Sequence, residues 1–165
     1  MINIIIGNVI ALVASLLMVY SGIIKQKKKI LFIQTIQIGL SVISNIVLGG
    51  IVGAIINVLS CIRNILCYKD KLNILWKVLI SIIAIVLSVK FNNLGLIGIL
   101  PLISTITYLW LMNIKDVVKF KLLIIFTMVL WFVYDLAIKS YSSAVFDLMT
   151  SITNIYSILK LNNKK

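Results

Sequence analysis

The feature that most constrains this chain is an apolar run that is too long for one membrane-spanning helix. Residues 30–68 contain a single charged side chain, that of Arg63. At about 1.5 Å per residue, one helix over this run would be about 58 Å long, nearly twice the ~30 Å thickness of a hydrocarbon core. Gly49 and Gly50 can break the run, because glycine adopts the positive φ angles of a tight reversal at no steric cost. The run therefore predicts two helices, at 30–48 and 51–68.

A second long run, residues 122–159, divides in the same way at Lys139 and Ser140. The other apolar runs are separated by short segments that contain lysine. The first run is followed rather than preceded by lysines, the reverse of a cleavable signal peptide, so it should remain in the mature protein. Pro101, the only proline, falls within the fifth run, and we expect it to bend that helix. The further helices are expected at 2–24, 73–89, 94–112, 120–138 and 141–159.

The composition places the chain in a lipid bilayer. Hydrophobic residues make up 62% of its 165 residues and charged residues 12%. A soluble domain of this size could not bury so many hydrophobic side chains in its interior. The expected fold class is therefore all-α and integral to the membrane, with seven transmembrane helices. The sequence has no histidine and no glutamate, which excludes the usual metal and general-base constellations. We expect no enzyme activity, no metal and no cofactor.

The net charge of +12 is distributed unevenly along the chain. A basic chain can bind nucleic acid, but these lysines lie between apolar runs and form no patch interleaved with aromatic residues. With seven helices, 13 lysines fall on one side of the membrane and two, Lys90 and Lys139, on the other. The positive-inside rule then predicts an outside amino terminus and a cytoplasmic carboxyl terminus. The expected partners of this charge are anionic lipid headgroups on the cytoplasmic side, not nucleic acid.

The first three and last three expected helices match in length and order, which indicates an internal duplication. At an offset of ninety residues, Asn45 coincides with Asp135, and a four-residue stripe coincides with another. Each stripe is spaced i, i+4, i+7, i+11 and so lies on one helix face. The stripes are Gly53, Asn57, Ser60 and Asn64, and Ser143, Asp147, Thr150 and Asn154. The predicted architecture is two parallel three-helix bundles, residues 1–69 and 94–165, joined by a linker, residues 70–93, with its helix at 73–89.

The two stripes are expected to face each other across an intramembrane site, with Asp147 as the most informative member. A carboxylate in mid-helix costs at least ~2.5 kcal/mol on insertion scales, so it marks either a functional site or a hydrogen bond between helices. Arg63 is expected to extend to the headgroups or, alternatively, to bind a ligand or an acid. Asp135 is expected to pair with Lys139, four residues along the same helix.

Helix 30–48 carries a second polar face, formed by Gln34, Gln37, Ser41 and Ser44. The corresponding helix of the second half offers an aromatic wall, formed by Trp131 and Tyr134, which is suited to stacking on a sugar or a heterocycle. The predicted substrate-binding residues are therefore Asn57, Ser60, Arg63, Asn64, Trp131, Tyr134, Asp147, Thr150 and Asn154.

Several short motifs resemble those of the YgjV-type bacterial inner-membrane proteins. They are Gln26-Lys27-Lys28-Lys29, Gln34 and Gln37, Leu48-Gly49, Gly53, Asn57 and Arg63-Asn64, followed by Trp131, Tyr134 and Asp135. The resemblance covers nearly the whole chain and implies a location in the bacterial inner membrane.

That family is distantly similar to the SWEET sugar facilitators and the PnuC-type vitamin transporters, which have three-plus-one-plus-three helices. The similarity implies that Asn57 or Asn64, together with Asn154, faces a substrate, and that Asp147 stands at the remaining position. One departure concerns the prolines. SWEET-like proteins carry prolines in the leading helices of both halves, whereas here only Pro101 is present and its partner position is Ala11, which puts their gating mechanism in doubt.

These features predict a carrier or facilitator of a small polar solute across the bacterial inner membrane. The alternative is a non-transporting membrane protein that assists the assembly of another complex through helix packing. The carrier predicts a hydrated void between the two polar stripes, whereas the assembly protein predicts polar side chains that pair off directly. A second copy of the chain is a candidate partner in either case.

Overall fold

The computed structural model describes residues 2–23, 27–112 and 116–162, and this part of the chain is built of helices. All seven expected helices are present in it, and their ends lie close to those predicted except at the start of the fifth, which begins at Leu100 instead of residue 94. They are α1 (Ile2–Ile23), α2 (Lys27–Val47), α3 (Ile51–Tyr68), α4 (Ile74–Phe91), α5 (Leu100–Leu111), α6 (Val117–Ala137) and α7 (Tyr141–Asn162), with a short 3-10 helix η1 (Ile97–Ile99) before α5.

The turns that divide the two long apolar runs have the same hydrogen-bond pattern. Between α2 and α3, Gly49 has a φ of +80° and the N–H of Gly50 donates to the Asn45 carbonyl at 2.7 Å. Between α6 and α7, Lys139 has a φ of 61° and the N–H of Ser140 donates to the Asp135 carbonyl at 2.8 Å. Such a left-handed residue with a bond back to the last turn is a common helix ending. Both predicted breaks are therefore confirmed.

The expected bend at Pro101 is wrong. α5 begins at Leu100, so Pro101 lies in its first turn, where the missing N–H costs no helical hydrogen bond. The chain before it is not α-helical, because Gly95 has a φ of +57° and the Asn92 side chain forms hydrogen bonds with nearby backbone groups. The Asn92 side chain accepts from the N–H of Leu94 at 3.0 Å and donates to the carbonyl of Gly95 at 2.7 Å.

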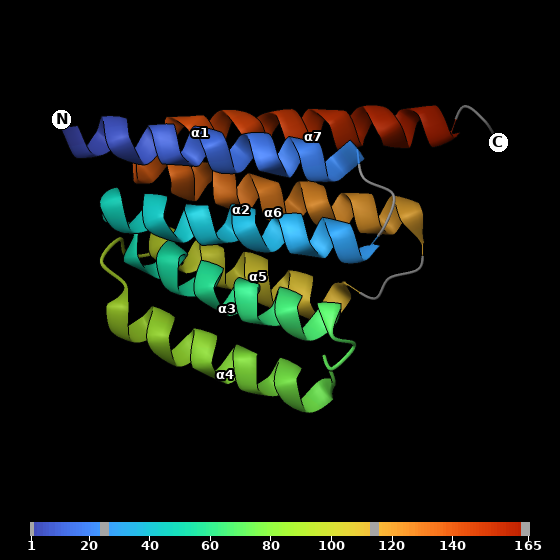
Figure 1. Cartoon of the computed structure of the whole chain (residues 1–165), viewed down its shortest axis with the longest axis horizontal. Helices are drawn as coiled ribbons and strands as arrows, with labels where there is room; N and C mark the ends of the chain where they lie inside the picture. Colours follow the sequence, from blue (N-terminus) through green and yellow to red (C-terminus); the bar gives the residue numbers. More distant parts are fainter. Residues whose placement is uncertain (1, 24–26, 113–115, 163–165) are drawn as a thin grey trace.

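Successive helices run in opposite directions, as Figure 1 shows. We call one end of the bundle the turn end, because it holds the α2–α3 turn, the α4–α5 connection and the α6–α7 turn. α1, α3, α5 and α7 all finish at the opposite end, which we call the lysine end because Lys69, Lys71 and Lys119 lie there. α1 begins at the turn end and α7 finishes at the lysine end.

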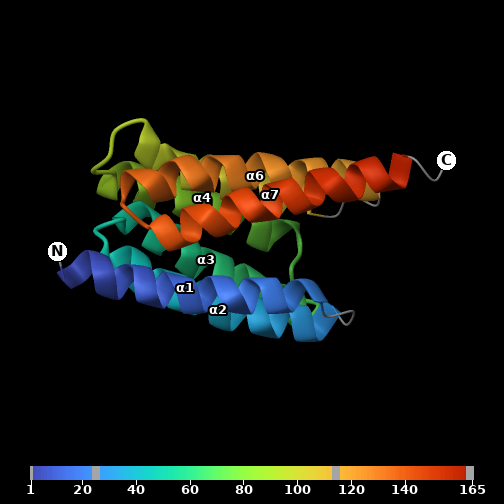
Figure 2. The ribbon, with the colours of Figure 1, turned by 90° about the horizontal axis from the view of Figure 1, so that it is seen from above.

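The neighbours of each helix define a ring of six. Contacts join α1 to α2, α2 to α3, α3 to α5, α5 to α6, α6 to α7 and α7 back to α1. α4 packs outside this ring against α3 and α5. In Figure 2, α1 and α7 lie together near the turn end and diverge toward the lysine end.

The dry core lies on one side of the ring, between α3, α4 and α5. Its buried members are Val52, Ile56, Leu59, Ile80, Ala84, Leu102 and Leu109. Many large apolar side chains point outward, such as Val86 of α4 at 57% and Ile152 of α7 at 56% exposure, and this surface suits lipid rather than water. In the described residues, α3, α4 and residues 2–20 of α1 are long and apolar enough to span a membrane. The structure therefore agrees with an all-α membrane protein.

Candidate functional site

The ring encloses a cavity of about 640 Å³. All six ring helices contribute to its lining, and among the described residues α4 contributes none, as expected for a connecting helix. The polar face of α2, with Gln34, Gln37, Ser41 and Ser44, also lines it. Gln37 donates to the Ser41 hydroxyl at 3.2 Å. The cavity is therefore lined by many polar residues, although the bundle around it is apolar.

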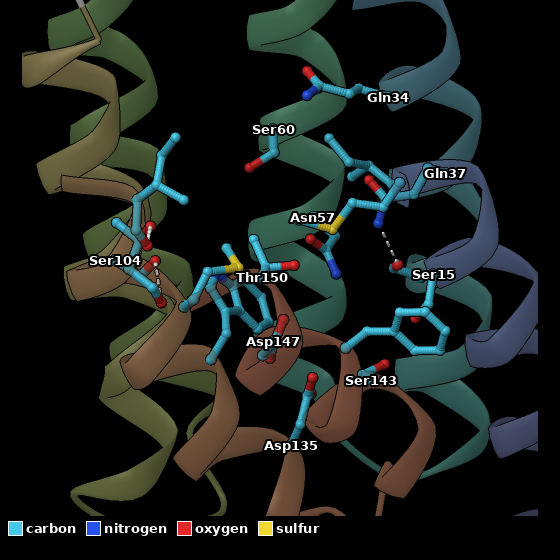
Figure 3. A pocket seen from close by; sticks show the side chains of 18 of the residues that line it. Ser15, Gln34, Gln37, Asn57, Ser60, Ser104, Asp135, Ser143, Asp147 and Thr150 are labelled. Atoms are coloured by element: carbon cyan, nitrogen blue, oxygen red, sulfur yellow. Dashed lines mark hydrogen bonds between the residues drawn. The ribbon is translucent and has the colours of Figure 1, made fainter. Parts of the chain in front are cut away.

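Seven of the nine predicted substrate-binding residues line this cavity. Figure 3 shows Asn57 and Ser60 on α3 opposite Asp147 and Thr150 on α7. α3 can do this because its two faces differ: Val52, Ile56 and Leu59 pack in the dry core, whereas Asn57 and Ser60 of the polar stripe face the cavity. The seven are Asn57, Ser60, Arg63, Trp131, Asp147, Thr150 and Asn154.

Tyr134, an eighth predicted residue, lies beside the cavity rather than in its lining. Its side chain is fully buried, and its hydroxyl accepts a hydrogen bond of 2.8 Å from the N–H of Gly53. Its ring meets that of Trp131 edge to face, with 5.7 Å between the centroids. Tyr134 therefore joins α6 to α3 at the turn end of the cavity, and Trp131 alone supplies the predicted aromatic wall.

Asn64, the ninth, is also outside the lining, where it binds Arg63. The Asn64 side-chain oxygen accepts from Nε and Nη2 of Arg63 at 3.2 and 3.0 Å. The guanidinium also lies over the ring of Tyr108, 5.0 Å from its centroid, a favourable cation–π arrangement. Arg63 is only 8% exposed, so the expected extension to the headgroups is wrong. The cation is held inside the bundle and lines the cavity.

Asp135 was not among the predicted binding residues, yet it lines the cavity next to Asp147. Asp135 and Asp147 are 5% and 8% exposed, and their carboxyl groups point toward each other from α6 and α7 (Figure 3). The Asp147 Oδ2 atom is buried and has no hydrogen-bond partner among the described residues. The expected pairing of Asp135 with Lys139 is wrong, because the helix ends at Ala137 and the carboxyl group turns inward.

The turn end of the cavity is closed by hydrogen bonds between helices. Ser44 donates to the carbonyl of Gly7 at 2.8 Å, joining α2 to α1. Asn8 of α1 donates to the Lys139 carbonyl at 2.8 Å and accepts from the N–H of Ser142 at 2.9 Å. Toward the lysine end, the lining continues to Lys121 and Asn154. The cavity thus extends from a closed turn end to the end where α1 and α7 diverge.

Comparison with known families identifies the chain. A family model described as a bacterial inner membrane protein, YgjV type, matches residues 5–165. The chain belongs to the YgjV family. The resemblance predicted from short motifs is confirmed, and this YgjV protein resides in the bacterial inner membrane. No curated protein and no solved structure matches the chain.

The lining of this YgjV protein includes further polar residues that sequence reasoning missed. Asn45 and Asp135 occupy the same place before the two matching turns, and both line the cavity. Their coincidence at the ninety-residue offset was the signal that could have placed them there. Ser15 and Thr105 of α1 and α5 also coincide at this offset. Ser104 and Tyr108 of α5 do not, because their counterparts are Ala14 and Met18, so the repeat did not mark them.

Proposed function

We propose that this YgjV protein is a carrier or facilitator of a small polar solute across the inner membrane. The observation that carries the proposal is the cavity of about 640 Å³, which has the size of a small-molecule site. Amide, hydroxyl and carboxyl groups converge in it from both halves of the chain, whereas the outside of the bundle is apolar. Intramembrane polar residues that face a cavity commonly mark a transport pathway.

We further propose the three-plus-one-plus-three architecture with residues 1–69 and 94–165 as the two bundles. A two-fold exchange of α1 with α5, α2 with α6 and α3 with α7 maps the ring of helix contacts onto itself. The same exchange relates the Gly49–Gly50 turn to the Lys139–Ser140 turn. Both relations support a duplication, with α4 as the linker that restores chain direction.

The lysine count supports an orientation with the lysine end in the cytoplasm. In that orientation the cavity is closed toward the outside by the Asn8, Ser44 and Tyr134 contacts and extends toward the cytoplasm. Transport would then require these contacts to break while the lysine end closes, as one bundle rocks against the other.

The assembly-protein alternative predicts that the polar stripes pair directly with each other. Among the described residues, the side chains of Asn57 and Ser60 form no hydrogen bond with α7; instead a cavity lies between these helices. This arrangement favours the carrier, because a protein that acts only through helix packing gains nothing from a polar void.

The test is a thermal-shift screen of purified protein against sugars, nucleosides, amino acids and vitamins, followed by uptake of each stabilising solute into proteoliposomes. Asn57→Leu should lower uptake about tenfold, which corresponds to the loss of one hydrogen bond worth ~1.4 kcal/mol. Val58→Leu is the matched control, because Val58 is adjacent on α3 but 45% exposed on the apolar surface. Full uptake by a correctly inserted Asn57→Leu protein would contradict the proposal.

A further inference from the structure

We propose that Asp135 and Asp147 form a proton-exchange site at the closed end of the cavity. The two carboxyl groups come from adjacent helices, α6 and α7, whose register is fixed by the turn at Lys139 and Ser140. They face each other at the end of the cavity, below Asn57 and Thr150 in Figure 3.

The hydrogen-bonding capacity of the pair calls for a proton. An ionised carboxylate only accepts hydrogen bonds, whereas a protonated one can donate. Asp147 Oδ2 is buried with no partner in the described chain, although the Asp135 carboxyl group lies against its own. Two acceptors in contact bond only when one proton lies between them, as in other carboxyl pairs that share a proton. The site therefore holds at least one proton.

The positive charges of the cavity lie away from the aspartate pair. Arg63 is bound to Asn64 and lies over Tyr108, about 9 Å farther along α3 from Asn57 at 1.5 Å per residue. Lys121 is about four turns from Asp135 on α6, toward the lysine end. Tyr134 lies beside Asp135, but its hydroxyl is bound to Gly53. The α1 residues in the lining, Ser15, Met18 and Val19, carry no charge. Among the described residues, a proton is thus the charge compensation that the pair lacks.

Exchange of this proton changes the charge of the cavity. When the proton leaves for water in the cavity, two carboxylates remain in contact inside the membrane, an arrangement that favours entry of a cation or return of the proton. This last step rests on the proposed function. If the protein carries a solute through the cavity, proton exchange at the pair would couple solute movement to proton movement.

Infrared spectroscopy of the purified protein in liposomes tests the site without any solute. The chain has only four acidic side chains, and two of them, Asp70 and Asp116, are exposed outside the cavity. The wild-type protein should show the carbonyl band of at least one protonated carboxyl group. The band should shift in deuterium oxide and disappear as the pH is raised.

Asparagine variants assign the band. Asp135→Asn combined with Asp147→Asn should abolish it, whereas Asp70→Asn and Asp116→Asn should leave it unchanged. Absence of the band in the wild type at neutral pH, or failure of the band to shift in deuterium oxide, would overturn the proposal even if the double variant fails to insert. A wild-type protein that transports a solute but shows no such band would overturn the proton site and leave the carrier intact. A protein that shows the band but transports no solute would contradict the carrier and leave the proton site intact.

Discussion

The Tyr134 hydroxyl accepts a hydrogen bond of 2.8 Å from the N–H of Gly53, across the turn end of the cavity. Gly53 is the third residue of α3, where a backbone N–H has no partner within its own helix. Tyr134 therefore caps a helix that is far away in sequence. The contact also needs glycine, because a Cβ atom on residue 53 would lie 2.6 Å from Cε1 of Tyr134.

Gly53→Ala should lower the free energy of unfolding by about 1–3 kcal/mol, as expected for overpacking against a buried ring. Gly39→Ala is the control, because an added Cβ meets nothing within 4 Å there. It should stabilise α2 by about 0.5–1 kcal/mol. Equilibrium unfolding in mixed detergent micelles measures both, and equal effects of the two substitutions would contradict the packing described.

Tyr134→Phe should cost about 1–3 kcal/mol, because it leaves the buried N–H of Gly53 without an acceptor while keeping the ring. Tyr156→Phe provides a comparison, since Tyr156 is 67% exposed and should change stability little. The same unfolding assay applies. An unchanged stability of Tyr134→Phe would show that the N–H is satisfied in another way.

Asn8→Ala should separate α1 from the α6–α7 turn, because Asn8 bonds both the Lys139 carbonyl and the Ser142 N–H. Loss of two hydrogen bonds predicts a decrease of about 1–2 kcal/mol in unfolding free energy. Hydrogen exchange at the start of α7 should also accelerate, since the Ser142 N–H lies in the first turn. Asn3→Ala, at an exposed position on the same helix, should leave both measurements unchanged.

Thr150→Cys should react with a small, charged thiol reagent in membranes, because residue 150 lines the cavity. Ile152→Cys, two residues farther along α7 and 56% exposed on the apolar surface, should face lipid and react slowly, since a thiolate is needed for the reaction. Both variants require a background in which Cys61 and Cys67 are replaced by alanine. Labelling of Ile152→Cys alone would show that the cavity is closed to water.

Several elements could be predicted closely from sequence because their causes are local. The glycine pair at 49–50 ended one helix as expected, and Lys139 ended another although it is not glycine. The spacing of Asn57 and Ser60 places both side chains on one face of α3, regardless of which part of the protein lies opposite that face. Pro101 was misjudged because a proline within an apolar run fits either a kink or a first turn. The bonds of Asn92 to nearby backbone groups decided between them.

The seven helices and their membrane location could be derived from local sequence alone, because helix length, apolar content and turn residues act within one segment of chain. Only the tertiary structure decided which polar groups meet. Asp135 and Asp147 lie twelve residues apart, and their contact depends on how α6 and α7 pack after the turn. Likewise, Tyr134 reaches Gly53 because α3 and α6 approach closely at the turn end. Such contacts depend on the relative positions of whole helices, which periodicity within a single helix does not specify.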